Sequence, residues 1–415
     1  MSGRFAFIES NTTGTGVRAV HRLLARGDEV VFFTRTPEKY PLLAGAAGEL
    51  KLVQADTNDV DGMTGEVARL QRERPLDALV TFSEFYVPMV ATVAERCALR
   101  ALSPRAATAC RDKFSTRRHL AAAGRATPRF RLVASEDEAR AAGAEVGYPC
   151  IVKPPADSSS KGVLLVAGEE ELVAQFRRLN AWAVNDRGQA LTGQVLIESV
   201  LRGPEVSVET MTLGADRTQV VGITAKHLSQ PPLFVEIGHD YPAALAPAEA
   251  ARIEEEVQAA LAAVGFDFGP AHTEVRLTPE GPVVVEINPR LAGGMIPELV
   301  RHAQGIDLLS AYFDLLAGRP VDLAARQEGW ASIRFLLAGR SGRLTGVAGL
   351  EEARSLALVR EATLGKALGS SVRPAQEAAD RLGYVIASGA SRADVLSAVD
   401  RALASIELQI TSPEG

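Results

Sequence analysis

Cysteine, lysine and long apolar runs are all scarce in this chain of 415 residues. Its three cysteines, Cys97, Cys110 and Cys150, have no metal-binding spacing, and an odd number cannot complete a disulfide framework. We therefore expect reduced thiols and a cytoplasmic protein. No stretch approaches the roughly eighteen apolar residues of a membrane-spanning helix. The start, MSGRFAFIES, is too short and too polar for a signal peptide.

Positive charge is also too sparse for a nucleic-acid surface. The formal net charge is -6, and no dense basic run occurs. The hydrophobic share of 47% and the charged share of 23% are ordinary for a globular protein. We expect small-molecule partners, no nucleic acid and no membrane, and we leave a homodimer open. The length predicts roughly three domains.

Strands and helices alternate over the first hundred residues. Apolar runs predict strands at 5–9, 29–34, 50–56 and 77–82. Helical stretches between and after them are expected at 17–27, 60–73 and 86–98. This alternation is typical of a small parallel α/β domain, which we place at 1–104.

The middle of the chain predicts an α+β module. A helical stretch at 105–123 precedes two strands, 148–154 and 162–168, which we expect to form a hairpin around the loop ADSSSK. Further antiparallel strands are expected at 194–200, 205–213 and 218–228, and a proline-rich loop at 230–247. A smaller α/β region follows residue 300. The remaining domain boundaries are expected at 105–190, 191–305 and 306–415.

The stretch VVVEINPRLAGG (283–294) combines an apolar strand with a polar face. Side chains alternate along a strand, so Glu286, Asn288 and Arg290 point the same way. A charge on a strand that is apolar enough to be buried is costly unless something pairs with it. The stretch therefore predicts a bound partner.

The preceding strand supplies a second acid. A three-residue turn centred on Glu280 would pair HTEVRL (272–277) with this stretch and set Glu274 opposite Glu286. Opposed like charges destabilise a strand pair, and a divalent cation relieves the repulsion. The two carboxylates and the Asn288 carbonyl are hard oxygen ligands that suit Mg²⁺, with Mn²⁺ as an alternative. The competing interpretation is a solvated charged hairpin.

This pattern, Glu274 followed by Glu-x-Asn-Pro-Arg, resembles the magnesium signature of the ATP-grasp superfamily. The resemblance covers residues 1 to about 300 well, and the remainder loosely. It implies α/β and α+β structure in an ATP-grasp fold. We expect an N-terminal parallel α/β domain, a central ATP-grasp domain and a smaller C-terminal α/β subdomain.

The resemblance also implies an ATP site. The loop that closes over phosphates in the superfamily corresponds to Ser158, Ser159, Ser160, Lys161 and Gly162. The linker whose backbone reads adenine corresponds to Glu198, Ser199, Val200 and Leu201, and Glu205 matches the acid that binds ribose hydroxyls. We expect Lys161 to gain a partner only when phosphates bind.

Lysine usage supports an ATP site independently. The chain has 45 basic residues, of which only seven are lysines. A compact ammonium group suits phosphate as a point charge. Four of the seven fall at or near the implied phosphate contacts: Lys113, Lys153, Lys161 and Lys226. The alternative for each of them is a lysine on the solvated surface. This alternative fits Lys153 least well, because Lys153 lies inside an apolar strand.

A second resemblance indicates which reaction the protein would catalyse with ATP. The segment FVEIGHDYPA (234–243), together with NPRLAGG, is similar to L-amino-acid ligases, which make dipeptides from unprotected amino acids. The resemblance implies that ATP phosphorylates a carboxylate and that an amine captures the acyl phosphate. It implies catalytic roles for Arg290 and His239. It implies substrate contacts for Glu84, Glu236, His239, Arg290, Gly293 and Gly294.

Each of these assignments has an alternative in which the residue plays no part in catalysis or substrate binding. Arg290 could form a structural salt bridge to Glu286, and His239 could be a solvated loop histidine. Glu84 could be an exposed acid at a helix start. The pocket loops at 230–245 and 293–300 are expected to decide the two substrates.

Three other functions compete with a ligase. GTGVRA (14–19) fits a dinucleotide fingerprint, but the second strand ends in FFTRTP, without the acid that would bind a ribose. A biotin-carboxylase-like enzyme would share the metal hairpin, but the chain has no biotinyl-acceptor site. A non-catalytic ATP-binding regulator would not need Arg290.

Overall fold

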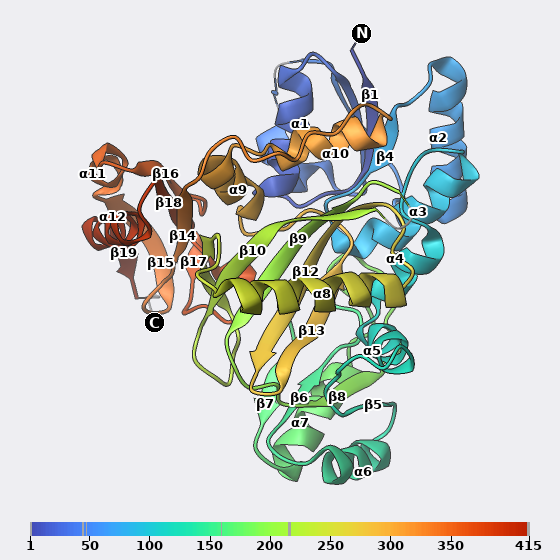
Figure 1. The fold of residues 1–415 in the computed structure, drawn as a ribbon, viewed down its shortest axis with the longest axis vertical. Coiled ribbons are helices and arrows are strands. Elements are labelled where there is room, and N and C mark those ends of the chain that lie inside the picture. The colour runs from blue at the N-terminus through green and yellow to red at the C-terminus, as the bar shows by residue number, and fades with distance from the viewer. Residues whose placement is uncertain (1, 44, 47, 159, 215–216, 413–415) are drawn as a thin grey trace.

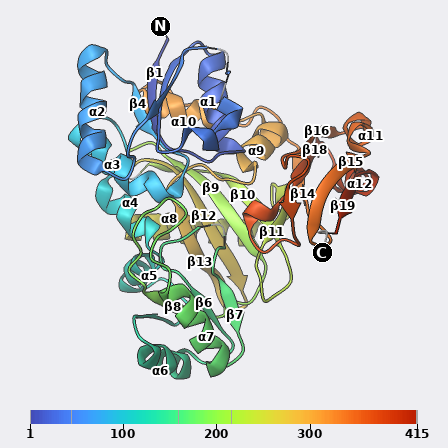
Figure 2. The ribbon, with the colours of Figure 1, turned by 180° about the vertical axis from the view of Figure 1, so that it is seen from behind.

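The computed structural model describes residues 2–43, 45–46, 48–158, 160–214 and 217–412. Figure 1 shows an N-terminal domain at the top, a broad central sheet, a small lobe below it and a C-terminal lobe at one side. Figure 2 shows the same arrangement from behind. Within the described residues, no helix has the length and apolarity needed to cross a bilayer.

Four parallel strands in the order β3-β2-β1-β4 form the N-terminal sheet. Its strands are β1 (Arg4–Ile8), β2 (Glu29–Thr34), β3 (Leu50–Gln54) and β4 (Ala78–Val80). Its helices are α1 (Thr15–Ala25), α2 (Val60–Glu73), α3 (Val87–Arg96) and the short 3-10 helices η1 (Pro37–Lys39), η2 (Pro41–Leu43) and η3 (Glu84–Tyr86). Every residue of β1 is buried, as expected for a parallel strand covered on both faces. The predicted parallel α/β domain is confirmed.

The predicted helical stretch 105–123 is broken at Asp112. It forms α4 (Pro104–Arg111) and α5 (Lys113–Ala122). Asp112 has extended backbone, and its carboxylate accepts a hydrogen bond from the Ser115 amide at 2.6 Å. This is the N-cap arrangement that short acidic side chains favour. The break places Lys113 at the first position of α5.

The small lobe holds a four-stranded sheet in the order β5-β8-β6-β7. Its strands are β5 (Phe130–Val133), β6 (Cys150–Lys153), β7 (Leu164–Val166) and β8 (Val195–Ser199), covered by α6 (Glu136–Val146) and α7 (Glu169–Asn180). Cys150 pairs with Val166, so the predicted hairpin around ADSSSK is confirmed. Strand β8 joins this sheet although it follows residue 190.

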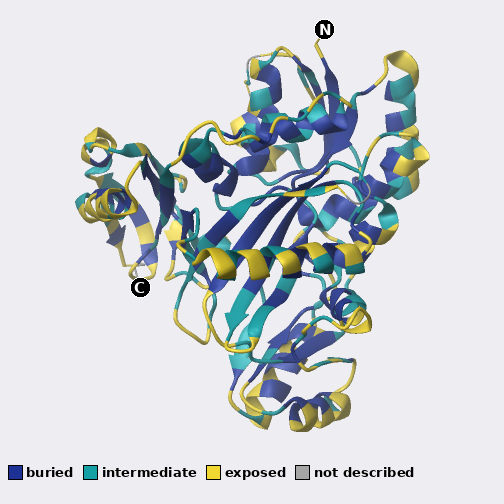
Figure 3. Cartoon of the chain, viewed as in Figure 1, coloured by how far each residue is buried: buried dark blue, intermediate teal, exposed yellow. Residues whose placement is uncertain are grey.

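Eight strands form the central sheet, in the order β13-β12-β9-β10-β11-β14-β18-β16. Five of them are β9 (Glu205–Thr212), β10 (Thr218–Leu228), β11 (Glu236–Tyr241), β12 (Gly269–Thr278) and β13 (Gly281–Asn288). Helix α8 (Pro247–Ala263) crosses the sheet with its outer face exposed (Figure 3). Ile253 and Val257 on its inner face pack into the same buried cluster as Val284 of β13.

Strand β11 corrects the prediction of a loop over 230–247. Its sequence EIGHDY lacks a clean alternation of apolar and polar residues, and prolines flank it on both sides. Strands β10 and β14 nevertheless pair with it on its two edges. Sheet context overrides weak local propensity here. The correction matters because β11 carries Glu236 and His239.

The C-terminal region extends the central sheet with β14 (Trp330–Leu336), β16 (Val359–Leu364) and β18 (Gly383–Gly389). A separate small sheet contains β15 (Gly342–Ala348), β17 (Ser371–Val372) and β19 (Glu407–Thr411). The helices are α9 (Ile296–Gln304), α10 (Leu308–Leu316), α11 (Leu350–Ser355), α12 (Arg392–Ser405) and the 3-10 helix η4 (Ala378–Asp380). Helix α10 returns to the N-terminal domain, where the Phe313 ring lies 5.3 Å from that of Phe5.

Candidate active site

Strands β12 and β13 set two acids face to face. Glu274 pairs directly with Glu286, as the sequence predicts. The turn is shorter than predicted, because Thr278 already pairs with Gly281, and a bulge after Glu274 shifts the register by one residue. Without that bulge Glu274 would oppose Val285, on the other face of the strand.

The donor set at this hairpin fits Mg²⁺. The side chains of Glu274 and Glu286 are 17% and 18% exposed, so both carboxylates remain reachable from solvent. Asn288 is buried at the end of β13, on the same strand face as Glu286. Three hard oxygen donors leave coordination positions for water and phosphate oxygens.

Buried lysines neutralise both acids. Lys113 Nζ lies 3.0 Å from Glu286 Oε1 and also donates to the Asp157 carbonyl at 3.0 Å. Lys226 Nζ lies 2.7 Å from Glu274 Oε1. The solvated-surface alternative is therefore wrong for both lysines, which are 7% and 8% exposed.

Lys226 connects the hairpin to two further acids. Its ammonium lies 2.7 Å from Glu205 Oε1 and 2.9 Å from Glu236 Oε1. Burial alone would lower the pKa of Lys226, but Glu205, Glu236 and Glu274 hold it well above the ordinary value. Glu205, the predicted ribose ligand, also pairs with Arg276 at 2.7 Å.

Glu198 lies at the centre of a second buried charge cluster. Its carboxylate is 2.7 Å from Arg117 Nε and 2.5 Å from Lys153 Nζ. Burial alone would raise the pKa of Glu198, but the two cations lower it to about 2. Arg117 also donates to the carbonyls of Val284 and Val285 at 3.0 and 2.8 Å, which ties β8 to β13. The surface-lysine alternative is wrong for Lys153, which is 5% exposed.

The predicted adenine linker spans the end of β8. Ser199 closes the strand, and its amide donates to the Arg129 carbonyl at 2.9 Å. Val200 and Leu201 follow the strand and are half-buried. Their contact with adenine stays a prediction.

The predicted phosphate loop joins β6 to β7. The Ser158 amide donates to Asp157 Oδ1 at 2.8 Å, and Ser160 Oγ donates to the Phe234 carbonyl at 3.2 Å. Gly162 precedes β7, and Ser159 lies outside the described residues. Lys161 corrects an expectation, because it already has a partner. Its ammonium pairs with Asp186 and lies 5.1 Å from the centre of the Trp182 ring.

Arg290 and Glu84 form a buried ion pair between the hairpin and the N-terminal domain. Arg290 Nη2 lies 2.6 Å from Glu84 Oε2, and Arg290 Nη1 donates to the Leu291 carbonyl at 3.1 Å. Burial alone would raise the pKa of Glu84, but Arg290 lowers it below its ordinary value. The two alternatives, an exposed Glu84 and an Arg290 salt bridge to Glu286, are both wrong. Within the described chain, Arg290 Nε has no hydrogen-bond partner.

His239 is completely buried in β11, so the solvated-loop alternative is wrong. Neither ring nitrogen has a hydrogen-bond partner among the described residues. Nε2 lies 3.7 Å from Glu236 Oε2, too far for a hydrogen bond. Burial lowers the pKa of His239 to about 3, so its imidazole is neutral at physiological pH. A buried imidazole without hydrogen-bond partners can form a hydrogen bond with a bound ligand.

Two adjacent glycines lie beside His239. A Cβ added at Gly293 would meet no atom within 4 Å, which agrees with the room for a substrate implied by the sequence. A Cβ added at Gly294 would lie 2.5 Å from His239 Nε2, and its φ of 57° is in the left-handed region. The lack of a side chain at Gly294 thus leaves room for the buried imidazole, and Gly293 borders open space.

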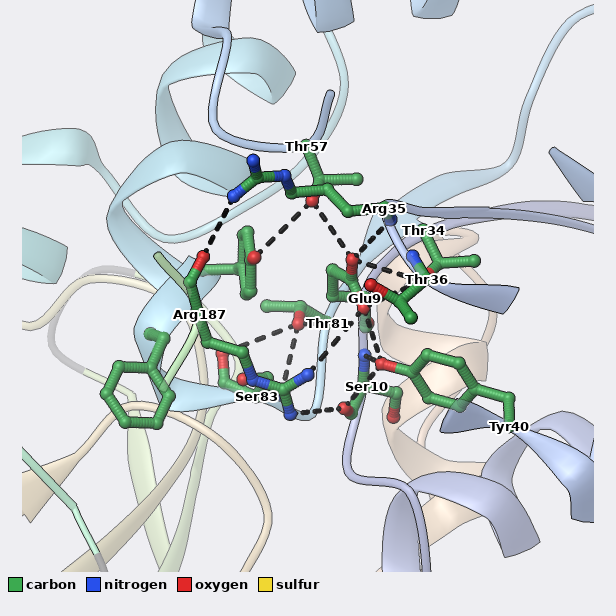
Figure 4. A network of polar contacts seen from close by, with 12 residues as sticks. Glu9, Ser10, Thr34, Arg35, Thr36, Tyr40, Thr57, Thr81, Ser83 and Arg187 are labelled. Carbon is green, nitrogen blue, oxygen red and sulfur yellow. Dashed lines mark hydrogen bonds and ion pairs between the residues drawn. The ribbon is translucent and has the colours of Figure 1, made fainter. Parts of the chain in front are cut away.

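A polar network fills the carboxyl end of the N-terminal sheet (Figure 4). Glu9 is 3% exposed, and it accepts hydrogen bonds from Tyr40 Oη at 2.6 Å and Thr57 Oγ1 at 3.0 Å. Thr34 Oγ1 and the Arg35 amide also donate to it, at 3.1 and 2.8 Å. Because these donors satisfy the Glu9 carboxylate, we assign it a structural role.

Arg187 links this network to the small lobe. It follows Asp186, the partner of Lys161, in the segment between α7 and β8. Its guanidinium donates to the Ser10 carbonyl at 3.1 Å, and Figure 4 shows it beside Glu9. Its own carbonyl accepts from Asn58 Nδ2 at 3.0 Å. One short segment therefore contacts both the phosphate loop and the N-terminal domain.

A second group of possible metal ligands contains Glu298, His302 and Glu361. Arg18 lies 3.6 Å from Glu298 and also pairs with Glu361, and Arg301 lies 2.6 Å from Glu298. Arginines therefore already neutralise these acids, and this group is a charge network.

Several residues of the site have no recognisable signal in the sequence. Arg117 resembles any other basic residue of a helix, and Arg381 lies in a polar C-terminal segment, yet both contact site acids. Their partners are more than 80 residues away along the chain, so no local pattern indicates them.

Three family models match separate parts of the chain. The family model described as ATP-grasp domain matches residues 146–298, and the ATP-grasp N-terminal domain matches residues 24–99. The model described as L-amino acid ligase C-terminal domain 2 matches residues 334–411. An uncharacterised protein of Sinorhizobium fredii, y4rH, is 31% identical over 395 residues, covering 95% of this chain and 80% of that protein. The chain belongs to the ATP-grasp superfamily.

More distant relatives include enzymes. Alanine–anticapsin ligase of Bacillus amyloliquefaciens is 28% identical over 273 residues, which cover 62% of this chain and 58% of that enzyme. The L-amino acid ligase of Bacillus licheniformis has a similar fold, with a TM-score of 0.83, 24% identity and 99% of both chains covered. The predicted superfamily and fold are confirmed.

Proposed function

We propose that this ATP-grasp protein is an ATP-dependent carboxylate–amine ligase that forms an amide or peptide bond. The observation that carries the proposal is the placement of Arg290, Glu84 and the neutral His239 around the hairpin of Glu274 and Glu286. The ligase names of two relatives agree with it. Amino acids, or a small carboxylic acid and an amino acid, are the proposed substrates.

The proposed reaction has two steps. A substrate carboxylate oxygen attacks the γ-phosphorus of ATP, the bond to the ADP oxygen breaks, and an acyl phosphate forms. The amine nitrogen then attacks the acyl carbon, phosphate leaves, and the nitrogen loses a proton. In such reactions the protein contributes mainly positioning and neutralisation of charge.

Each residue has a role consistent with its position. Glu274, Glu286 and Asn288 would hold Mg²⁺, which neutralises phosphate oxygens when bound. Lys113 and Lys153 would contact phosphates from their buried positions. Arg290 would stabilise negative charge on the reacting carboxylate and at the acyl carbon.

The amine substrate would bind beside Glu236 and His239. Glu236 can attract an ammonium group. The neutral imidazole of His239 can accept a proton from the amine or hydrogen bond to the transferring phosphoryl group. The open space at Gly293 would accommodate the substrate backbone.

The decisive experiment traps the acyl phosphate. Purified protein is incubated with ATP, Mg²⁺, hydroxylamine and single L-amino acids or small carboxylic acids. We expect a hydroxamate and ADP without an amine substrate. Turnover that needs both a carboxylate and an amine but releases AMP and pyrophosphate would refute the acyl-phosphate route. Turnover that requires bicarbonate and biotin would support the carboxylase alternative instead.

A further inference from the structure

The C-terminal region places one arginine in the candidate active site. Arg381 follows η4 and is only 14% exposed at its side chain. Its Nη2 lies 2.8 Å from Glu236 Oε2, and its Nε donates to the Glu236 carbonyl at 3.1 Å. One guanidinium therefore fixes both the side chain and the backbone of Glu236.

The same guanidinium also supports His239 through an aromatic ring. The Arg381 guanidinium carbon lies 3.9 Å from the centre of the Phe335 ring. The Phe335 ring in turn meets the His239 ring edge to face, with centres 5.7 Å apart and planes at 85°. Arg381, Phe335 and His239 form a continuous series of contacts beside Glu236.

Glu236 needs this second cation. Its Oε1 contacts Lys226, but Lys226 is shared with Glu205 and Glu274. Arg381 is bound to Glu236 and no other acid among the ion pairs of the described chain. It therefore holds Oε2 in place, 3.7 Å from His239 Nε2.

The segment that carries Arg381 is itself ordered by hydrogen bonds. Asp380 accepts from the amides of Gln376 and Glu377 at 2.9 and 3.2 Å, and from Arg373 Nε at 2.8 Å. On the other side, the Leu382 amide donates to the carbonyl of a β14 residue at 2.8 Å. Arg381 thus projects from a braced turn, which lowers the entropy lost in fixing its side chain.

We propose that Arg381 is a positioning residue for the amine substrate, supplied by the C-terminal subdomain. The proposal rests on the ligase function given above. Arg381 orients the Glu236 carboxylate, and through Phe335 the His239 ring, for contact with the amine. It does not touch the hairpin acids that face the phosphates.

The test separates amine capture from carboxylate activation. Arg381→Ala, Arg381→Lys and the control Arg401→Ala, an exposed arginine on α12, are compared with the unmodified protein. The carboxylate and amine are the pair that releases most ADP in a screen of L-amino acids and small acids. Each protein is assayed for amide formation with that pair, and for hydroxamate formation with hydroxylamine replacing the amine.

We expect Arg381→Ala to raise the KM for the amine roughly ten- to a hundred-fold, the range typical of a misplaced reacting group. Hydroxamate formation and the KM for ATP should change by less than about two-fold, because hydroxylamine is too small to need the Glu236 contact. Arg381→Lys should recover part of the loss, since lysine keeps the charge but lacks the planar guanidinium fork that reaches both the carboxylate and the carbonyl of Glu236. Arg401→Ala should match the unmodified protein.

Two outcomes would overturn the proposal. An unchanged KM for the amine in Arg381→Ala would remove the positioning role, and so would equal losses of hydroxamate and amide. If Arg381→Ala does not fold, an amine KM for Arg381→Lys equal to that of Arg401→Ala would have the same meaning. Absence of hydroxamate from the unmodified protein, with AMP released, would instead refute the underlying ligase function.

Discussion

Glu274 of β12 lies directly opposite Glu286 of β13, and each carboxylate contacts a different buried lysine. Opposed acids destabilise an isolated strand pair, so this arrangement needs cations. Lys226 and Lys113 supply them here, from β10 and α5. Phosphates would attract the same ammonium groups, and the acids would then be available to a metal ion.

Replacing Glu286 tests the metal site. We expect Glu286→Gln to reduce Mg²⁺-dependent ADP release by roughly a hundred-fold or more, because a neutral amide is a weaker ligand for a hard cation. The fold should persist, because glutamine has nearly the same size, its amide oxygen can still accept from Lys113, and the repulsion with Glu274 is removed. Glu280→Gln, at the exposed turn of the same hairpin, is the matched control. Normal ADP release by Glu286→Gln would rule out the metal assignment.

Replacing Arg290 separates catalysis from nucleotide binding. Its guanidinium pairs with Glu84, which belongs to the N-terminal domain. We expect Arg290→Ala to lower the hydroxamate rate by roughly a hundred- to a thousand-fold, the cost of losing a group that stabilises developing charge. Binding of ATP, measured by calorimetry, should weaken far less. Equal losses in both measurements would indicate a nucleotide-binding role instead.

The charge cluster around Glu198 predicts a pH-dependent stability. Its folded-state pKa of about 2 lies below the ordinary value of 4.5, so the ionised carboxylate stabilises the fold at higher pH. This contribution is complete above about pH 4.5 and is lost as the pH falls towards about 2. We expect Glu198→Gln to lower the melting temperature clearly at pH 7, because Arg117 and Lys153 then lose a buried counter-ion.

The matched control for Glu198 is Glu136→Gln in the same lobe. Glu136 pairs with Arg177 at the surface, where ion pairs contribute little. Melting temperatures measured between pH 7 and pH 3 should show a large gap between the two variants at pH 7 and a smaller one at pH 3. A gap that does not shrink with falling pH would contradict the assigned linkage.

The sequence predicts those parts of the site in which the side-chain pattern repeats every two residues along a strand. Alternation along β13 places Glu286 and Asn288 on one face, and β12 adds Glu274 across the turn. The sequence predicts that pairing through a three-residue turn, whereas the chain uses a tighter turn and a bulge. A bulge depends on strain and packing, which single-residue patterns do not record.

Contacts between distant segments could not be predicted. Strand β11 has weak propensity, and its two neighbours in the sheet impose its conformation. Arg381 reaches Glu236 across 145 positions of the chain. Lys161 pairs with Asp186, which lies in a loop that has no pattern of apolar residues. Burial and charge pairing decide such contacts only after the domains have packed.

Adjacent glycines offer a matched pair of substitutions. Gly294→Ala would bring a Cβ to 2.5 Å from His239 Nε2, in a backbone conformation with φ of 57° that alanine rarely adopts. We expect this variant to lose roughly 1–2 kcal/mol from the left-handed backbone alone. Its catalytic rate should also fall, because the added methyl group pushes the buried imidazole away from its position.

Gly293→Ala should behave differently, because its added Cβ meets nothing within 4 Å and its φ is not in the left-handed region. We expect a melting temperature close to that of the unmodified protein. The KM for one substrate should change, since the methyl group enters the space proposed for a substrate backbone, and larger substrates should be affected more than smaller ones. Thermal melting and a substrate-size series check both expectations. A Gly293→Ala variant with unchanged KM values across that series would remove Gly293 from the substrate site, whereas a low melting temperature would show that the space beside it is needed by the fold.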